Sequence, residues 1–205
     1  GRLFQQGLQE GGLGFGHHLA NTPGAGVAEM LELYQQAAGA GVVNFIHIRS
    51  FGQVSPTAAG REVVDAAEAT GASIHVVHLN SSGIWEMMGL LDILDKAQGK
   101  GLDISTEVYP YTGASSSLDD PRVSKESMAA MGAEFSDLEL VVTGERLTRE
   151  SFEYHKAHTQ QRDLVAHIMD QADVDAAVAH PMVMIGSDAI GAAHPRSAGT
   201  VARIF

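Results

Sequence analysis

Short apolar stretches recur at intervals of about 30 residues, and this spacing most constrains how the chain folds. VVNFIHI ends near His47, ASIHVVHL ends near His78, and LDISTEVYPY carries Glu107. His47 and His78 are 31 residues apart, and Glu107 follows 29 residues later. A strand, a crossover helix and the next parallel strand together take roughly 30 residues. The spacing therefore predicts repeated βα units and a parallel sheet.

The segments between these stretches have the pattern of helices that end at glycine. Residues 27–41 and 56–71 both close on glycine, and the second opens on Pro56, a residue favoured at the first helical position. Residues 83–101 form the next expected helix. Apolar runs without alternation indicate helices on both faces of a sheet, which leaves an open doubly wound sheet or a (β/α)8 barrel. We expect six core strands, near 13–17, 42–48, 73–79, 103–108, 163–168 and 182–187.

Composition narrows the class of protein. The chain has 205 residues, 44% of them hydrophobic, and a net charge of −12 at pH 7. This charge argues against nucleic acid or an anionic membrane as the main partner. The chain has no cysteine, no apolar run long enough to span a bilayer and no signal-peptide pattern. We expect a cytoplasmic protein that takes a small-molecule substrate, with a homo-oligomer left open.

The βα rhythm breaks over residues 112–147. A polar stretch, GASSSLDD, comes first, and the apolar segment LELVVTGERLT follows a short helical pattern. We expect a loop insertion at 112–147 within one partial barrel domain that covers 1–205. The first residues lack an initiator Met and have a helical pattern, so we expect the chain to start partway through a larger fold.

Four expected strands end on side chains that can bind a metal ion: His47, His78, His167 and Asp188. The carboxyl ends of parallel strands meet at one edge, where active sites of such folds lie. Imidazole and carboxylate are ligands of Zn²⁺, whose bound water loses its proton near neutral pH. For Asp188 a helix N-cap is the alternative. A lone histidine is more often a hydrogen-bonded core or rim residue, which is our interpretation of the others in strands and helices: His75, His155, His158 and His180.

Several motifs resemble the D-aminoacylase group of the amidohydrolase superfamily. They are HIRS (47–50), HVVHLNSSG (75–83), TEVYPYTGASS (106–116), TGERLT (143–148) and IGSDAIGAAHPRSAGTVAR (185–203). That group includes N-acyl-D-amino-acid and N-acyl-D-glutamate deacylases. The resemblance implies an α/β fold, a (β/α)8 barrel of which this chain covers about strand three to strand eight. It also implies zinc-dependent hydrolysis of the amide bond of an N-acylated D-amino acid.

The resemblance also implies roles for single residues. His47 and His78 match metal histidines, and Asp188 matches the strand-eight aspartate that touches metal and serves as general base and acid. Tyr109 matches a tyrosine that polarises the scissile carbonyl or binds substrate, with a packed core aromatic as the alternative. Arg196 and Ser115 lie where the family contacts the substrate carboxylate, with a surface ion pair as the alternative for Arg196.

The chain also departs from the family pattern. It has no match to the His-x-His of strand one, the strand-two bridging ligand or the C-terminal part, so the site would hold one or two zinc ions incompletely. Asn80 stands where relatives carry Lys two residues after the second metal histidine, which resembles the D-glutamate deacylase variant. Two alternatives stay open: a cyclic amidase of the dihydroorotase or hydantoinase type, and a non-catalytic relic of the barrel.

Overall fold

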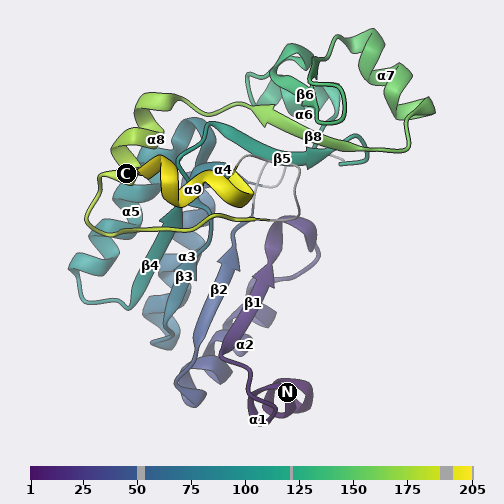
Figure 1. The fold of residues 1–205 in the computed structure, drawn as a ribbon. Coiled ribbons are helices and arrows are strands. Elements are labelled where there is room, and N and C mark those ends of the chain that lie inside the picture. Colours follow the sequence, from purple (N-terminus) through teal and green to yellow (C-terminus); the bar gives the residue numbers. More distant parts are fainter. Residues whose placement is uncertain (50–53, 121, 190–195, 205) are drawn as a thin grey trace.

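The computed structural model describes residues 1–49, 54–120, 122–189 and 196–204. Its main sheet has five parallel strands, and their spatial order follows the order along the chain (Figure 1). A sheet wound in one direction is the arrangement of a (β/α)8 barrel, whereas doubly wound sheets reverse their strand order at a switch point. The strands are β1 (Gly14–His18), β2 (Val43–His47), β3 (Ile74–Val76), β4 (Ile104–Val108) and β9 (Val183–Ile185).

Three long helices lie together on one side of this sheet (Figure 1). They are α2 (Val27–Ala40), α3 (Pro56–Thr70) and α5 (Met87–Gly99). The first two end at Gly41 and Gly71, both with a φ of 66°, which only glycine adopts without strain. Ser55 caps α3 by accepting a hydrogen bond from the backbone of Ala58 at 3.3 Å. The remaining helices around the sheet are α1 (Arg2–Gln9), α4 (Leu79–Gly83), α8 (Gln171–Val178) and α9 (Arg196–Ile204).

The two faces of the main sheet differ. Ile46 is buried against the helices, whereas Phe45, the preceding residue of β2, is 41% exposed on the other face. This other face also carries His18, His47 and Glu107, because side chains alternate along each strand. The expectation of helices covering both faces is therefore wrong for β2. A polar inner face and a helix-covered outer face are typical of part of a barrel.

A second, antiparallel sheet contains the strand predicted at 163–168. This strand, β8 (Asp163–His167), pairs with β5 (Gly113–Ser117) and β6 (Leu138–Leu140), and β6 also pairs with β7 (Glu145–Arg146). The prediction that this strand belongs to the parallel core sheet is thus wrong. The insertion over 112–147 stays a prediction, and the second sheet reaches beyond that range.

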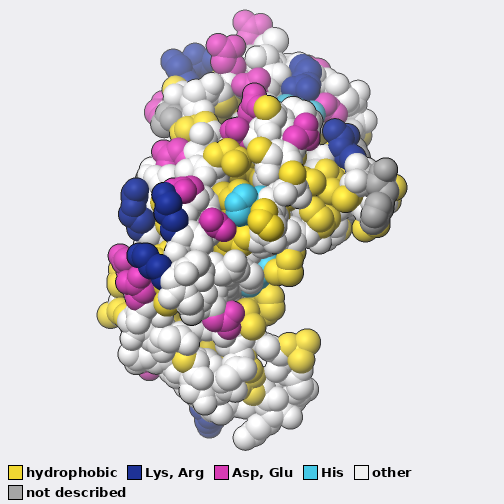
Figure 2. Space-filling model, turned by 90° about the vertical axis from the view of Figure 1, so that its left-hand side faces the viewer, with side chains coloured by type: hydrophobic (Ala, Val, Ile, Leu, Met, Phe, Trp, Pro, Cys, Tyr) yellow, Lys and Arg dark blue, Asp and Glu magenta, His cyan; other side chains and the backbone are white. Residues whose placement is uncertain are grey.

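The second sheet has its own apolar core. Leu138, Leu140 and Leu164 pack there with Phe152 of α7 (Arg149–His158), and α6 (Lys125–Ala130) lies beside them. Charged side chains gather toward the outer end of this lobe, while hydrophobic side chains lie over the middle of the face in Figure 2. Within the described ranges, no helix has the length and apolar character needed to cross a membrane.

Candidate active site at the carboxyl ends of the strands

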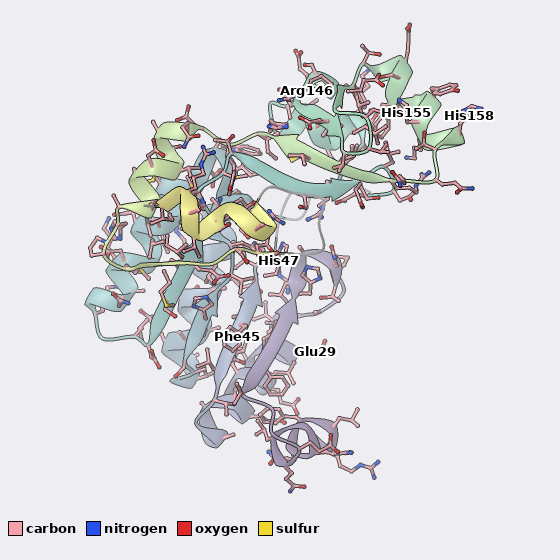
Figure 3. All side chains as sticks on the ribbon, viewed as in Figure 1. Glu29, Phe45, His47, Arg146, His155 and His158 are labelled. Carbon is pink, nitrogen blue, oxygen red and sulfur yellow. The ribbon has the colours of Figure 1, made fainter. Side chains whose placement is uncertain are left out.

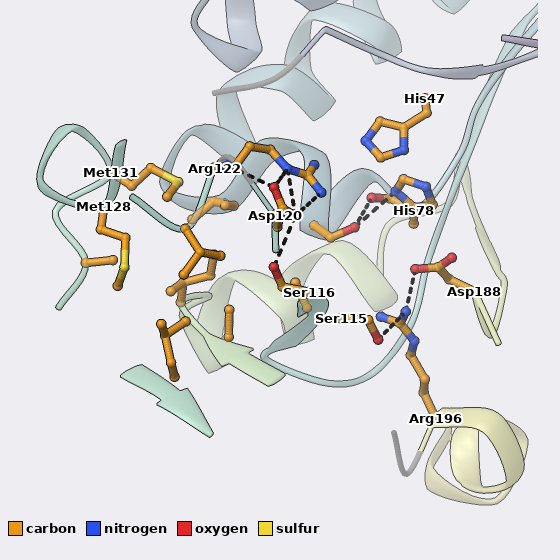
Figure 4. A pocket seen from close by; sticks show the side chains of 18 of the residues that line it. His47, His78, Ser115, Ser116, Asp120, Arg122, Met128, Met131, Asp188 and Arg196 are labelled. Carbon is orange, nitrogen blue, oxygen red and sulfur yellow. Dashed lines mark hydrogen bonds and ion pairs between the residues drawn. The ribbon is translucent and has the colours of Figure 1, made fainter. Parts of the chain in front are cut away.

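One cavity of about 220 Å³ lies between the carboxyl ends of the parallel strands and the second sheet. The main sheet supplies His47, and the segments after β3 and β9 supply His78 and Asp188. The second sheet and its loops supply an apolar wall (Figure 4). The cavity thus has a polar floor, where three of the predicted site residues meet, and a wall that includes Val123, Met128, Met131 and Leu138.

Three histidine rings form a continuous series along the floor. The ring centroids of His18 and His47 are 4.5 Å apart, and those of His47 and His78 are also 4.5 Å apart. His18 and His47 are register partners in the pairing of β1 with β2. His78 lies one residue beyond Val77, whose backbone N–H donates to the carbonyl oxygen of Ile46. His78 therefore needs a change of backbone direction to reach His47.

The backbone provides this change at two of the predicted metal ligands. His78 has a φ of 35° and Asp188 has a φ of 45°, both in the left-handed region. Non-glycine residues with positive φ are uncommon, and such strained positions cluster at functional sites. The hydroxyl oxygens of Ser81 and Ser82 lie 3.0 and 3.3 Å from Nδ1 of the His78 ring. The chain turns sharply at each residue and aims its side chain into the cavity.

The environment keeps the two central imidazoles uncharged. Burial, together with His78, His18 and Arg122, lowers the pKa of His47 to about 2. Burial also lowers the pKa of His78, although the carboxylate of Asp188 acts in the opposite direction. A neutral imidazole keeps a lone pair on one ring nitrogen, which is the form that binds metal ions.

Asp188 and Arg196 form a buried ion pair at the edge of the cavity. Nη2 of Arg196 lies 2.9 Å from Oδ2 of Asp188 and donates a hydrogen bond of 2.9 Å to the hydroxyl of Ser115. The guanidinium also lies over the ring of Tyr109, 4.5 Å from its centroid. The alternative of a surface ion pair for Arg196 is wrong, since this residue is only 2% exposed.

Two predicted site residues lie behind the cavity wall. Tyr109 is fully buried beneath Arg196, and burial raises the pKa of its hydroxyl to about 12. Asn80 is also fully buried, and its amide nitrogen donates to the backbone oxygens of Tyr109 at 3.0 Å and Tyr111 at 3.3 Å. Neither side chain lines the cavity. Their assigned contacts with substrate stay predictions, and the observed contacts hold the YPY segment.

His167 does not join the other strand-end residues. Its Nε2 lies 3.0 Å from Oε2 of Glu139 within the second sheet. Including it among the metal-capable strand ends was therefore wrong, because β8 is not part of the parallel sheet. His155 and His158 lie on α7, far from His47 (Figure 3). His75 and His180, which we interpreted as structural histidines, each have a hydrogen-bond partner. Nδ1 of His75 lies 2.9 Å from the hydroxyl of Ser105, and Nδ1 of His180 accepts from the backbone N–H of Met182 at 3.3 Å.

Sequence reasoning missed most of the cavity lining, including the basic side chains of His18 and Arg122. His18 lies 29 residues before His47, so the same spacing that links His47 to His78 could have found it. Arg122 comes from the polar loop after β5 and pairs with Asp120, Nη2 to Oδ2, at 2.6 Å. No periodic signal marks Arg122, because the packing of the second sheet over the first brings it to the site.

The floor of the cavity carries the types of donor side chain that zinc requires, but these side chains do not surround a common point. Neutral imidazoles and a carboxylate are ligands that zinc accepts. Over the described ranges, no three His, Cys, Asp or Glu side chains surround one point closely enough to hold a metal ion. His47 fits the role of a ligand best, since its half-buried ring contacts other rings and no hydrogen bond contributes to its lowered pKa.

Comparison with known proteins finds relatives that this chain resembles in sequence and in fold. An N-acyl-D-glutamate deacylase from Alcaligenes xylosoxydans xylosoxydans is 28% identical over 230 residues, which cover all of this chain and 44% of that protein. The crystal structure of N-acyl-D-glutamate deacylase from Bordetella bronchiseptica matches 95% of this chain, with a TM-score of 0.72 and 24% identity. The chain is thus similar in sequence to an N-acyl-D-glutamate deacylase and shares its fold with part of that enzyme's solved relative.

The solved structures also show how much of their length this chain covers. The Bordetella deacylase was complexed with zinc and with a phosphonate inhibitor that mimics the tetrahedral intermediate, and the chain covers 46% of it. A D-aminoacylase structure matches 87% of this chain and is 39% covered, with a TM-score of 0.64 and 22% identity. No protein-family profile matches. The predicted α/β fold with a parallel sheet, which matches part of these barrel structures, is confirmed. The chain spans less than half the length of these relatives.

Proposed function

We propose that this chain carries part of the active site of a zinc-dependent hydrolase that cleaves the amide bond of N-acyl-D-amino acids. The observation that carries the proposal is the meeting of His47, His78 and the Asp188–Arg196 pair around one cavity. The kinship with N-acyl-D-glutamate deacylases supports the same substrate class. A cytoplasmic location and a homo-oligomer stay predictions.

Arg196 is suited to the α-carboxylate of such a substrate. A guanidinium binds a carboxylate with two parallel hydrogen bonds, and the hydroxyl of Ser115 lies beside it. The ring of Tyr109 supports the guanidinium from below. In the free chain Asp188 occupies this guanidinium. An incoming carboxylate would compete with Asp188 and release its side chain toward the amide.

Arg122 favours a substrate with a second acidic group. It is the other arginine that lines the cavity, on the side formed by the second sheet. Asp120 accepts hydrogen bonds from Nε and Nη2 of its guanidinium, and a guanidinium has five N–H donors, so donors remain for a second carboxylate. Two arginines in one cavity suit the two carboxylates of N-acyl-D-glutamate. The apolar wall with Met128 and Met131 suits an acyl group.

Asp188 is the residue that would move the proton. Once a substrate carboxylate has displaced Asp188 from Arg196, its carboxylate would be free to accept a proton from the attacking water. The water oxygen bonds to the amide carbon, and the carbon–nitrogen bond then breaks. The same carboxyl group would give its proton to the departing amine nitrogen. His47, His78 and Asp188 would hold zinc, which lowers the pKa of water and polarises the carbonyl when bound.

A non-catalytic chain is the second candidate. The observation that favours it is that no three donor side chains in the described part converge on one point. The two candidates differ in whether the chain binds zinc in a fixed ratio. A cyclic amidase stays an alternative, although Arg196 and Arg122 suit the carboxylates of an acyclic substrate better than a ring amide.

Zinc content and amine release, measured on one preparation, would separate these functions. The substrates are N-acetyl-D-glutamate, N-acetyl-L-glutamate and dihydroorotate, each assayed with the chain before and after chelation. We expect zinc-dependent release of D-glutamate and its loss in Asp188→Asn. His158→Asn is the matched control, because His158 lies on α7 outside the cavity. A chain that binds no zinc and releases no amine would overturn the proposal.

A further inference from the structure

We propose that the apolar wall of the cavity is a subsite for the acyl group of the substrate, and that it favours a straight acyl chain such as hexanoyl over acetyl. The inference rests on the proposed function and deepens it, because it assigns the part of the substrate that binds neither arginine. It follows from where the apolar side chains lie relative to Arg196.

The charged and apolar groups lie at different ends of the cavity. In Figure 4, Arg196 lies at one end, and Met128 and Met131 lie at the other. Arg122 lies between the two methionines and His47 in this view. A ligand whose carboxylate binds Arg196 must therefore be elongated to reach the methionines.

The amide bond of the substrate directs the acyl chain toward that apolar end. The α-carbon carries the carboxylate that would bind Arg196 beside the hydroxyl of Ser115. A secondary amide is planar and trans, so the acyl chain and the α-carbon leave the carbon–nitrogen bond on opposite sides. With the reacting carbon near Asp188, the acyl chain points away from Arg196.

The wall at this end has apolar surface that an acetyl group is too small to cover. Its side chains come from the second sheet and the segments around it: Val123, Met128, Met131, Ala133, Leu138 and Ile168. All six belong to the apolar core of that sheet or pack against it. Each methylene added to a bound chain removes further apolar surface from water. Methionine side chains are flexible and fill irregular gaps, so they can close around such a chain.

An apolar side chain of the amino acid is the competing occupant of the wall. It would begin at the α-carbon, which the carboxylate holds close to Arg196. The acyl chain begins at the reacting carbon, one amide bond farther along the cavity. The position of Arg122 between the methionines and His47 also suits an acidic side chain, which leaves the wall to the acyl chain.

Calorimetric binding to the chelator-treated chain tests the subsite without turnover. The probes are N-acetyl-D-glutamate, N-butanoyl-D-glutamate and N-hexanoyl-D-glutamate. We expect Kd to fall at least about tenfold from acetyl to hexanoyl, since each fully buried methylene contributes roughly a factor of four. Equal affinity along the series, or no binding by any of the three compounds, would overturn the inference.

Two variants of the wall test where the acyl chain binds. Ala133→Leu fills part of the wall, and Met131→Gln makes it polar at similar size. Each should reduce the ratio of the acetyl Kd to the hexanoyl Kd by about fourfold or more, the effect of one methylene. The matched controls are Ala129→Leu at an exposed position of α6 and Met184→Gln at an exposed position of β9. Neither residue lines the cavity, so both controls should keep the parent ratio. An unchanged ratio in both wall variants would overturn the assignment.

Two further comparisons separate the possible failures. If N-acetyl-D-norleucine binds more tightly than N-acetyl-D-alanine while acyl length has no effect, the wall binds the amino-acid side chain and the inference is wrong. If zinc-dependent amine release from N-acetyl-D-glutamate occurs without a gain from longer acyl chains, the subsite fails and the proposed function stands. If hexanoyl binds more tightly but no amine is released, the subsite stands and the proposed function fails.

Discussion

Arg196 and Asp188 form an ion pair of 2.9 Å in which the guanidinium is 2% exposed and the carboxylate 17% exposed. The pair joins helix α9 to the segment after β9. It also lies over Tyr109 and beside Ser115. Each charge therefore stabilises the other away from water, and the proposed site requires both side chains.

Removing one partner of this pair should cost more stability than removing both. Arg196→Met leaves the carboxylate of Asp188 without its cation, and broken buried pairs typically cost about 3–5 kcal/mol. We expect about 2–4 kcal/mol here, because Asp188 is partly exposed. Urea unfolding of Arg196→Met, Asp188→Asn and the double variant measures the coupling. Additive losses would contradict a direct interaction between the two residues.

Gly186 has a packing role next to Asp188. A Cβ atom at this position would lie 2.2 Å from Oε2 of Glu107 and 2.4 Å from its Cδ. The carboxylate is the far end of a flexible side chain and can turn away, so Gly186→Ala should destabilise the chain by about 1 kcal/mol, the low end of overpacking costs. Adding Glu107→Ala should recover part of the loss. The control is Gly39→Ala in α2, where a Cβ meets nothing within 4 Å and helix propensity predicts a gain of about 0.5–1 kcal/mol.

The uncharged state of His47 should make the metal-free chain sensitive to acid. Its pKa falls from 6.5 to about 2 on folding, so the unfolded chain binds more protons between these values. The free energy of unfolding therefore rises with pH across this window, and stability is lost as pH falls below 6.5. Because of His47, the free energy of unfolding should be about 2 kcal/mol lower at pH 5 than at pH 8.

Unfolding of the chelator-treated chain at pH 8 and pH 5 measures this loss. The variant His47→Asn should lose less stability over the same interval, while His158→Asn should behave like the parent. The same pH dependence in His47→Asn as in the parent would contradict a buried, neutral His47 in the folded chain.

The parallel sheet was largely predictable from the sequence, since its signal is local. β-branched runs and glycine-ended helices located β1, β2, β3, β4 and β9. The residues that these strands carry at their carboxyl ends, His47 and His78, were also identified from their position. Both features repeat with the period of a βα unit, so neither requires knowledge of long-range packing.

The second sheet was not predictable in the same way. The run DLVAHI is as apolar as a core strand, yet it pairs antiparallel with β5, which is the polar sequence GASSS. Only tertiary pairing decides whether such a run joins the parallel sheet or the antiparallel one. The same packing brings Arg122 over His47, and it removes His167 from the site. The ion pair of Arg196 with Asp188 likewise depends on how α9 folds back.

Substrate selectivity should depend on Arg122. If its guanidinium donates hydrogen bonds to the side-chain carboxylate of the substrate, Arg122→Gln should raise KM for N-acetyl-D-glutamate by roughly tenfold or more, as the loss of a charged hydrogen bond predicts. The same change should leave KM for N-acetyl-D-alanine nearly unaltered, because that substrate has no second carboxylate. The measurement is steady-state amine release with both substrates.

Arg146→Gln is the matched control for this prediction. Arg146 belongs to the same antiparallel sheet but lies at its outer end, away from His47 (Figure 3). It pairs with Glu139 at 3.6 Å and does not line the cavity. An equal loss with both substrates in Arg122→Gln would mean that the Asp120–Arg122 pair only holds the loop in place. A loss confined to the glutamate substrate would instead make Arg122 the residue that selects an acidic side chain.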